Sequence, residues 1–267
     1  MLGELLKYEI PAIGRKLLPL YGAWAAASIF LGIGLRGFDS ESDLFSVLTI
    51  LLYVAVTVAV IVMSVILIVQ RYRNSMLGDE AYFNMVLPVS MNEHIANKGL
   101  SALIWMTVST LASLVSIFLI LLCSGSLFNI FPEFVQGIRE IIAEVGAHWL
   151  LVLIELIVLS ILSSAKSILA IYAAITIGYQ AKNHKTLASI GAYIALGMAE
   201  STVGNIFMRL GWMFNFGRFD NLIEFLSTHE FMTSQILMLV LFLVSIGLVA
   251  AYFFICKYFL EKKLNLA

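Results

Sequence analysis

Six long runs of apolar residues with few or no charges constrain this chain more than any other feature of its sequence. They cover residues 17–35, 44–70, 99–123, 149–178, 187–212 and 235–256. A hydrocarbon core about 30 Å thick is crossed by roughly 20 helical residues, and a helix satisfies its own backbone hydrogen bonds inside lipid. The runs therefore predict an all-α integral membrane protein with six transmembrane helices, organised as a single membrane domain over residues 1–267.

The composition supports this prediction. Hydrophobic residues make up 61% of the chain and charged residues 12%, whereas soluble domains are about half apolar and about a quarter charged. A water-soluble globule of this length has no means of covering so much apolar surface, so we expect lipid to cover it.

The basic residues divide unevenly between the two sides of the predicted spans. With the N-terminus inside, the outer segments hold only Arg36, Arg139, Arg209 and Arg218, together with nine acidic residues. The inner segments hold eleven basic residues, namely Lys7, Arg15, Lys16, Arg71, Arg73, Lys98, Lys182, Lys185, Lys257, Lys262 and Lys263. Because Lys and Arg are retained on the cytosolic side, we expect both termini in the cytosol.

The sequence contains no motif for catalysis or for nucleotide binding. The phosphate-binding pattern GxxxxGK[ST] is missing, and the nearest stretch, residues 184–186, lacks the glycines that let backbone amides cradle a phosphate. The histidines stand singly in separate loops, at His94, His148, His184 and His229. We expect no catalytic residue, no metal site and no nucleic-acid partner, and any ATP hydrolysis must occur in another chain.

Residues 1–16 are too polar to span a membrane, yet their apolar residues recur at roughly helical spacing. These residues, continuing into the first span, are Leu2, Leu5, Leu6, Ile10, Ile13 and Leu17. The pattern is typical of an amphipathic helix in the cytosolic interface, where apolar side chains enter the acyl boundary and basic ones meet anionic lipid. Pro11 is expected to kink or divide this helix. A plain lipid anchor and a segment that touches a partner protein remain alternatives.

The loop over residues 70–98, between the second and third spans, is the most informative stretch. It opens with Arg71 and Arg73 as anchors at the inner face and then places a dense apolar cluster in a segment that should face water. The cluster consists of Met76, Leu77, Tyr82, Phe83, Met85, Val86 and Leu87. An exposed loop gains nothing from so many large apolar side chains, so they lie in the membrane interface or pack into a partner protein.

Local signals within this loop predict a short helix followed by a restart. Gly78 and the acidic pair Asp79 and Glu80 indicate a turn into a helix whose first turn suits the helix dipole. Pro88 should end that helix. Ser90 with a glutamate three residues later then forms a capping-box pattern that starts the helix of the third span.

The run from Arg73 to Ile104 resembles the cytosolic loop of the small six-span permeases of type-two ABC transporters in Gram-positive bacteria. Such permeases share a "GDE-x-Y" element, a "TLPV"-like element and a lysine near the start of the third span. This chain has Gly78-Asp79-Glu80-Ala81-Tyr82, Val86-Leu87-Pro88-Val89 and Lys98. It departs from the pattern in carrying Val86 where threonine is usual.

The resemblance implies a permease subunit in the bacterial cytoplasmic membrane that dimerises, as a homodimer or a heterodimer, and sits on two ATP-binding subunits. Those ATPase subunits would bind ATP and Mg²⁺, so no cofactor is expected in this chain. The loop helix would be the coupling helix, received in a groove of the ATPase. Its partner-binding residues would be Gly78, Asp79, Glu80, Tyr82, Phe83, Val86, Leu87 and Pro88.

Four ionisable residues lie within the predicted spans, where each costs roughly 2.5 to 3.5 kcal/mol on insertion. They are Glu155, Lys166, Glu200 and Arg209. In a hairpin of the fourth and fifth spans around residues 181–185, Lys166 reaches the depth of Glu200, and Glu155 reaches the depth of Arg209. Each charge therefore has an opposite charge at its own level.

Helical geometry limits this pairing. Glu155 and Lys166 fall about 20° apart on their helix, but Glu200 and Arg209 fall about 180° apart at 100° per residue. Both pairs cannot form directly unless the fifth helix bends, for which Gly204 is the candidate. We expect a buried bridge between Lys166 and Glu200, with a substrate- or proton-handling role as the alternative. Glu155 and Arg209 lie near the outer interface, where water can hydrate them.

Two other classes of protein are compatible with these features. One is a self-contained secondary transporter or channel in which the four membrane charges form an ion path; it predicts transport driven by a gradient and gives no reason for the apolar loop cluster. The other is a membrane partner that transports nothing, such as an immunity or sensor subunit. Co-purification of an ATPase at equal stoichiometry would discriminate between these classes and an ABC permease.

Overall fold

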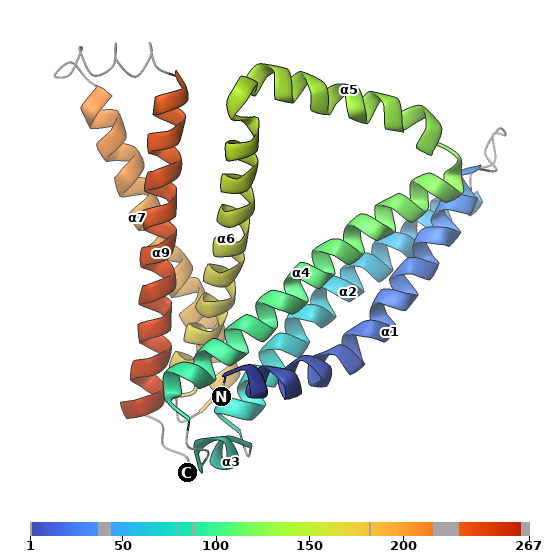
Figure 1. Cartoon of the computed structure of the whole chain (residues 1–267). Helices are drawn as coiled ribbons and strands as arrows, with labels where there is room; N and C mark the ends of the chain where they lie inside the picture. The colour runs from blue at the N-terminus through green and yellow to red at the C-terminus, as the bar shows by residue number, and fades with distance from the viewer. Residues whose placement is uncertain are drawn as a thin grey trace. The chain divides into compact units, whose positions relative to one another are not determined.

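The computed structural model describes residues 2–36, 44–78, 80–86, 89–181, 183–215 and 230–262. Its elements in chain order are α1 (Leu2–Arg36), α2 (Leu44–Met76), α3 (Glu80–Val86), α4 (Met91–Ser124), α5 (Leu127–Val145), the 3-10 helix η1 (Gly146–His148), α6 (Trp149–Gly178), α7 (Lys185–Asn215) and α9 (Glu230–Lys262) (Figure 1). Within these ranges every element is a helix.

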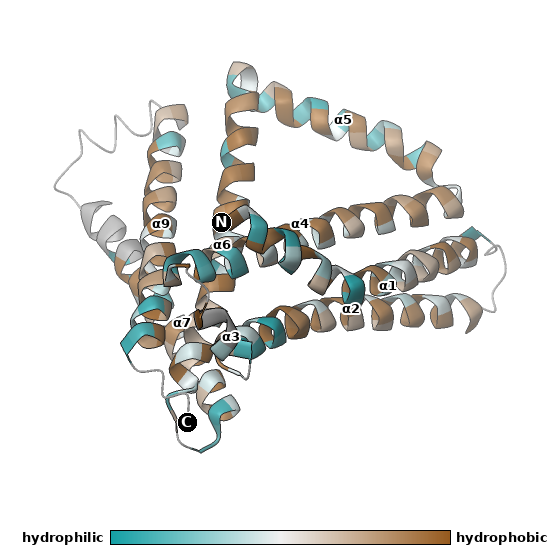
Figure 2. Ribbon diagram, turned by 60° about the horizontal axis from the view of Figure 1, so that its bottom comes forward, coloured by the Kyte–Doolittle hydropathy of each residue, from teal (hydrophilic) through white to brown (hydrophobic). Residues whose placement is uncertain are grey.

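Six of the described helical stretches are long and apolar enough to cross a membrane. They are residues 2–36, 44–76, 91–124, 127–178, 185–206 and 234–262. Figure 2 shows hydrophobic residues along most of the length of α2, α4, α6 and α9. The predicted all-α architecture with six helices of spanning length is therefore confirmed by length and composition.

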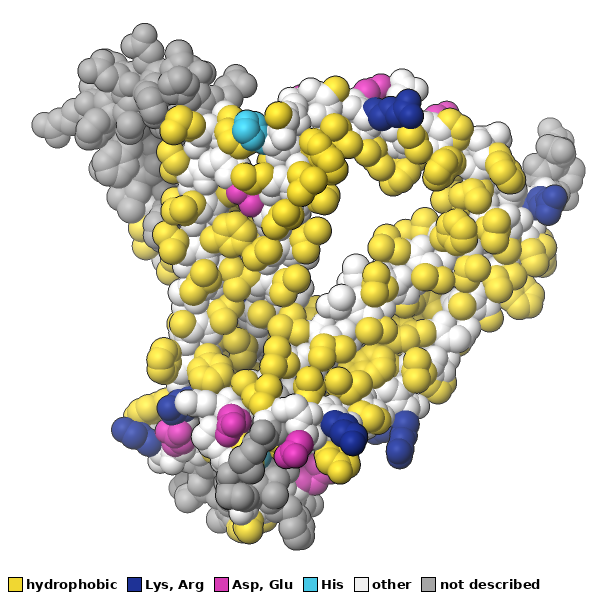
Figure 3. Space-filling view, in the orientation of Figure 1, with side chains coloured by type: hydrophobic (Ala, Val, Ile, Leu, Met, Phe, Trp, Pro, Cys, Tyr) yellow, Lys and Arg dark blue, Asp and Glu magenta, His cyan; other side chains and the backbone are white. Residues whose placement is uncertain are grey.

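The outward faces of these helices carry side chains that water would disfavour. Leu111, Leu114 and Phe118 on α4 are each more than half exposed, and in Figure 3 hydrophobic side chains cover the visible length of this helix. Contiguous apolar surface of this extent marks contact with lipid or with another protein. The exposed apolar surface therefore agrees with the sequence in indicating a multi-pass membrane protein.

The contacts within the chain divide it into two compact units. The first comprises Met1–Ser75 and Ala96–Ile154, with α1, α2, α5 and most of α4. The second comprises Met76–Ile95 and Glu155–Ala267, with α3, most of α6, α7 and α9. Each unit therefore has its own helix packing.

Hydroxyl and indole groups join the three long helices of the first unit. The indole Nε1 of Trp24 on α1 donates a hydrogen bond to Thr57 Oγ1 on α2 at 2.9 Å. The hydroxyl of Ser116 on α4 lies 2.7 Å from that of Ser28 and 2.9 Å from that of Tyr53. Such bonds between membrane helices contribute about 0.6 kcal/mol each on average, and here they connect α1, α2 and α4 to one another.

A tryptophan on α4 organises the apolar core of the first unit. Trp105 packs in a buried cluster with Ile13, Leu17 and Leu67. The backbone of α1 approaches this ring so closely that a Cβ atom on Gly14 would lie 2.6 Å from its ζ2 carbon. The face of the N-terminal segment that contains Ile13 and Leu17, which was expected to enter lipid, is therefore covered by the protein itself.

The N-terminal segment and the first span form one helix rather than two. α1 runs without interruption from Leu2 to Arg36 with Pro11 and Pro19 inside it, and its ribbon bends after the first turns (Figure 1). A proline within a helix removes one backbone hydrogen bond and crowds the preceding turn, which bends the helix. Of the two outcomes expected at Pro11, a kink or a division, the structure therefore has the kink in a continuous helix.

α5 has no counterpart among the predicted elements. It lies between α4 and α6 and is bracketed by two glycines in the left-handed region, Gly125 with φ 76° and Gly146 with φ 69°. The amide of Gly146 donates to the carbonyl of Ile142 and closes the helix. Because side chains with a Cβ rarely adopt this region, the glycines allow the chain to turn sharply at both ends of α5.

The second unit contains the predicted hairpin of the fourth and fifth spans. α6 ends at Gly178 and α7 begins at Lys185, and His184 between them has φ 58°. The two helices are in contact next to this turn, since a Cβ atom on Gly178 would lie within 2.5 Å of the backbone of Ser189. This tight return sets the relative depth of the residues on α6 and α7.

Replacing Gly14 by alanine should destabilise the first unit, because the new methyl group would displace the ring of Trp105. Overpacking of this kind typically costs about 1 to 3 kcal/mol. We expect a lower midpoint of thermal unfolding for the detergent-solubilised protein. Gly22→Ala on the same helix is the control, since no atom lies within 4 Å of its added Cβ. Equal midpoints for the two variants would contradict the close approach.

Candidate functional sites in the loop helix and the membrane charges

The loop between α2 and α4 contains the predicted short helix, α3. α3 begins at Glu80, and a carboxylate in the first turn of a helix interacts favourably with the helix dipole. The amide of Ala81 donates a hydrogen bond to the carbonyl of Gly78 at 2.9 Å. Ala81 is fully buried, whereas Tyr82 is 58% and Val86 is 85% exposed. α3 therefore has an attached side and a side that presents two large apolar side chains.

The other residues predicted for this site are only partly described. Phe83 belongs to the helical backbone of α3, while Asp79, Leu87 and Pro88 lie outside the residues that the structure describes. α3 ends at Val86, two residues before that proline. The position of the short helix is thus confirmed.

The predicted restart after α3 is also confirmed. The amide and the hydroxyl of Ser90 both donate to Glu93 Oε2 at 3.1 Å, and the amide of Glu93 approaches Ser90 Oγ at 3.4 Å. This reciprocal arrangement is a capping box, which satisfies amides that the first turn leaves without intrahelical partners. α4 accordingly begins at Met91.

Sequence reasoning missed a buried charge cluster in the first unit. Glu9 on α1 is 5% exposed and accepts hydrogen bonds from Arg71 Nε at 2.8 Å and Nη2 at 3.2 Å. Lys98 Nζ lies 2.6 Å from Oε2 of the same carboxylate, the oxygen that also accepts from Arg71 Nη2. Arg71 stands near the end of α2 and Lys98 near the start of α4, so one carboxylate holds the two helices that flank α3 in sequence.

This cluster, the Glu9 clamp, is held by more than charge. The contact between Arg71 and Glu9 is bidentate, which fixes the orientation of the carboxylate as well as its distance from the guanidinium group. The side chain of Lys98 is only 7% exposed, so its ammonium group depends on protein partners. A signal was present in the sequence, because at 100° per residue Glu9 falls on the apolar face of this segment, beside Leu6 and Ile13. A carboxylate on that face needs a cationic partner.

The pair predicted within the membrane is present in the second unit. Lys166 Nζ on α6 contacts Glu200 Oε1 on α7 in an ion pair. The hydroxyl of Tyr252 on α9 donates to the other carboxylate oxygen of Glu200 at 3.1 Å. The network has one positive and one negative side chain, and its residues come from α6, α7 and α9. The side chains of Lys166 and Glu200 are 22% and 31% exposed, so the network is partly accessible.

The second depth-matched pair does not form. Glu155 accepts a hydrogen bond from Gln235 Nε2 on α9 at 3.1 Å, and Arg209 is exposed. Among the residues described here, no ion pair joins Glu155 to Arg209. The physical reason is the angular one, since Glu200 and Arg209 lie about 180° apart on a straight helix.

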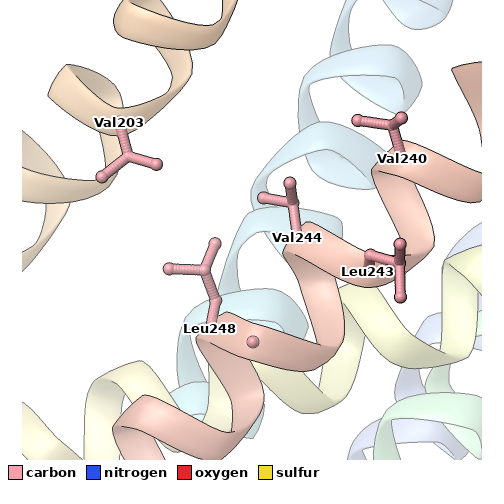
Figure 4. Close-up of a pocket in the computed structure, with 6 residues that line it drawn as sticks. Val203, Val240, Leu243, Val244 and Leu248 are labelled. Carbon is pink, nitrogen blue, oxygen red and sulfur yellow. The ribbon is translucent and has the colours of Figure 1, made fainter.

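An apolar groove between α7 and α9 ends close to this network. Figure 4 shows Val203 of α7 facing α9 across open space, with side chains of α9 on the other side. The lining residues are Val203, Val240, Leu243, Val244, Gly247 and Leu248. Glu200 lies one turn from Val203 and Tyr252 one turn from Leu248 on the same helix faces. An apolar surface thus leads to a charged and hydroxylic end.

The fold and these sites define a helical multi-pass membrane protein with a short helix in the loop between its second and third spans. Comparison with protein-family models, with curated proteins and with solved structures finds no match for the chain. The function is therefore argued from the sites themselves.

Removing the carboxylate of the Glu9 clamp should destabilise the protein strongly. Glu9→Gln leaves the charges of Arg71 and Lys98 without this partner, and breaking a buried ion pair costs about 3 to 5 kcal/mol. We expect low yield and a reduced unfolding midpoint. Glu4→Gln, on the exposed side of the same helix, should behave as the unaltered protein. If the two variants have the same midpoint, the Glu9 clamp does not stabilise the first unit.

The pair between Lys166 and Glu200 should behave as a coupled unit. Lys166→Met removes the cationic partner of Glu200 and leaves the hydrogen bond from Tyr252. We expect a loss of about 1 to 3 kcal/mol. Lys166→Met combined with Glu200→Met should recover much of this loss, since removing both partners is less damaging than removing one. Unfolding midpoints of the four proteins in the cycle provide the measurement. Additive losses would mean that the two side chains are not coupled.

Proposed function

We propose that this chain is the permease subunit of an ATP-driven ABC exporter in the bacterial cytoplasmic membrane. It acts as a dimer with a second permease, the same chain or a sister subunit, and with separate ATPase subunits. The observation that carries the proposal is the exposed apolar side of α3. Tyr82 and Val86 face outward from a helix that lies between two membrane spans in the chain.

In this proposal α3 is the coupling helix and Tyr82 and Val86 enter a groove of the ATPase. A short helix exposes large apolar groups to water only at a cost, which burial in a partner removes. The resemblance of residues 73–104 to the loop of type-two ABC permeases supports the same role. The bias of basic residues towards this side supports a cytosolic position for the loop, where an ATPase subunit could reach it.

The Glu9 clamp supports the mechanical side of the proposal. Only residues 77–79 and 87–90 link α3 to α2 and α4, so a displacement of α3 is passed directly to both helices. Arg71 and Lys98 bind the same carboxylate on α1, so α1, α2 and α4 respond together. Closure of the ATPase subunits would thereby move three spans as one body.

A secondary transporter that uses the membrane charges is the second candidate. The observation that favours it is the partial exposure of Lys166 and Glu200 beside the apolar groove. It predicts transport in proteoliposomes that is driven by an ion gradient without ATP or an ATPase subunit. The ABC proposal predicts no transport under those conditions and ATP-dependent transport when an ATPase subunit co-purifies at equal stoichiometry.

Truncating the exposed side of α3 should uncouple the permease from its ATPase. Tyr82→Ala with Val86→Ala removes two apolar side chains, and burying such groups contributes about 1.5 to 3 kcal/mol each. We expect normal membrane insertion and dimer formation, but less co-purified ATPase and no transport-linked stimulation of ATP hydrolysis. Glu80→Ala should have a smaller effect, because an exposed charge in a first helical turn contributes about 0.3 to 1 kcal/mol.

Crosslinking gives an independent measurement of the same contact. In a chain without Cys123 and Cys256, Tyr82→Cys should crosslink to the ATPase subunit, whereas Glu140→Cys on α5 should not. Full ATP-dependent transport by the double alanine variant, at normal ATPase levels, would remove the reason for assigning α3 as the coupling helix.

A further inference from the structure

α5 divides its residues between two faces more completely than the other long helices of the chain. At 100° per residue, all its large apolar side chains fall within an arc of about 160°, and all its charged side chains fall outside that arc. Phe134 and Ile138 lie near the centre of the apolar arc, while Gln136 and Glu140 lie on the opposite side. These four positions therefore alternate between the two faces along one stretch of helix.

The apolar face of α5 is not covered by any part of the chain that the structure describes. No residue of α5 is buried, and Phe131, Phe134 and Ile141 are 58%, 61% and 62% exposed. On the polar face Gln136 Nε2 donates to Glu140 Oε1 at 2.9 Å. Figure 2 shows hydrophobic and hydrophilic residues alternating along α5, and in Figure 3 its charged side chains gather along one edge and its hydrophobic ones along the other.

The neighbours of α5 in the chain identify what covers this face. α5 follows α4, which ends at Ser124, and leads through η1 into α6, which begins at Trp149. α4 has 34 residues and α6 has 30 residues, so each is long enough to cross a membrane. If both cross it, both ends of α5 are held at the same membrane surface. Gly125 and Gly146, with φ 76° and 69°, provide a sharp turn at each end. A 19-residue helix held in this way lies along the membrane surface.

We infer that α5 is an interfacial helix whose apolar face, with Phe131, Phe134, Ile138 and Ile141, is buried in lipid at the boundary between headgroups and acyl chains. Its acidic residues Glu133, Glu140 and Glu144 face water. The lipid contact does not depend on the coupling role of α3. The assignment to the outer leaflet rests on the orientation used in the proposed function, in which the loop between the third and fourth spans is external.

The inference is tested with single cysteines in the full-length chain from which Cys123 and Cys256 have been removed by alanine substitution. Phe134→Cys and Ile138→Cys sample the apolar face, and Gln136→Cys and Glu140→Cys are the matched controls. In intact cells we expect a membrane-impermeant maleimide to label the two controls at least about fivefold faster. In proteoliposomes containing brominated phosphatidylcholine, we expect a bimane dye attached at residue 134 or 138 to be quenched at least about twofold more than the same dye at residue 136 or 140.

Each alternative occupant gives a different result. Equal labelling at all four positions would mean that water covers the apolar face, and it would overturn the inference. Protection of residues 134 and 138 without quenching by brominated lipid would mean that a second copy or another protein covers that face, which would also overturn it. Labelling of residues 136 and 140 only after permeabilisation would overturn the outer placement and the proposed orientation, while the quenching pattern tests lipid contact separately.

Discussion

The absence of water from the bilayer core is the constraint on which the rest of this structure depends. Helices satisfy the backbone within each segment, but polar side chains need partners of their own, either on the same helix or on another one. Ser116 meets hydroxyls from α1 and α2, and Glu200 meets a cation from α6 and a hydroxyl from α9. Polar side chains of this second kind, such as Ser116 and Glu200, join the helices of each unit to one another.

Near the N-terminal end of α1 the same constraint acts on a full charge. Glu9 is buried between Arg71 and Lys98. Further along α1, the ring of Trp105 packs against Ile13 and Leu17. The ion pairs of Glu9 and the packing of Trp105 together fix the position of α1 along α2 and α4.

Features encoded by local sequence were predictable, and features that depend on distant partners were not. The spans follow from apolar runs, α3 from its glycine and acidic start, and the capping box from Ser90 and Glu93. The depth of Lys166 and Glu200 follows from a short hairpin. Tyr252 and Glu9 acquire their roles from helices far away in sequence, which depth matching within one hairpin does not detect. The two-faced pattern of α5 is present in the sequence but is continuous with the uncharged end of the third run.

The order of the three residues in the Glu9 clamp has a consequence for biosynthesis. Glu9 is made first, Arg71 follows after the first two spans, and Lys98 precedes the third span. Until α4 has been synthesised and has entered the membrane, the carboxylate of Glu9 lacks one of its cations and remains most stable at the aqueous surface. Burial of the N-terminal segment is therefore a late event in assembly, and the closed clamp marks a chain whose first three spans have inserted together.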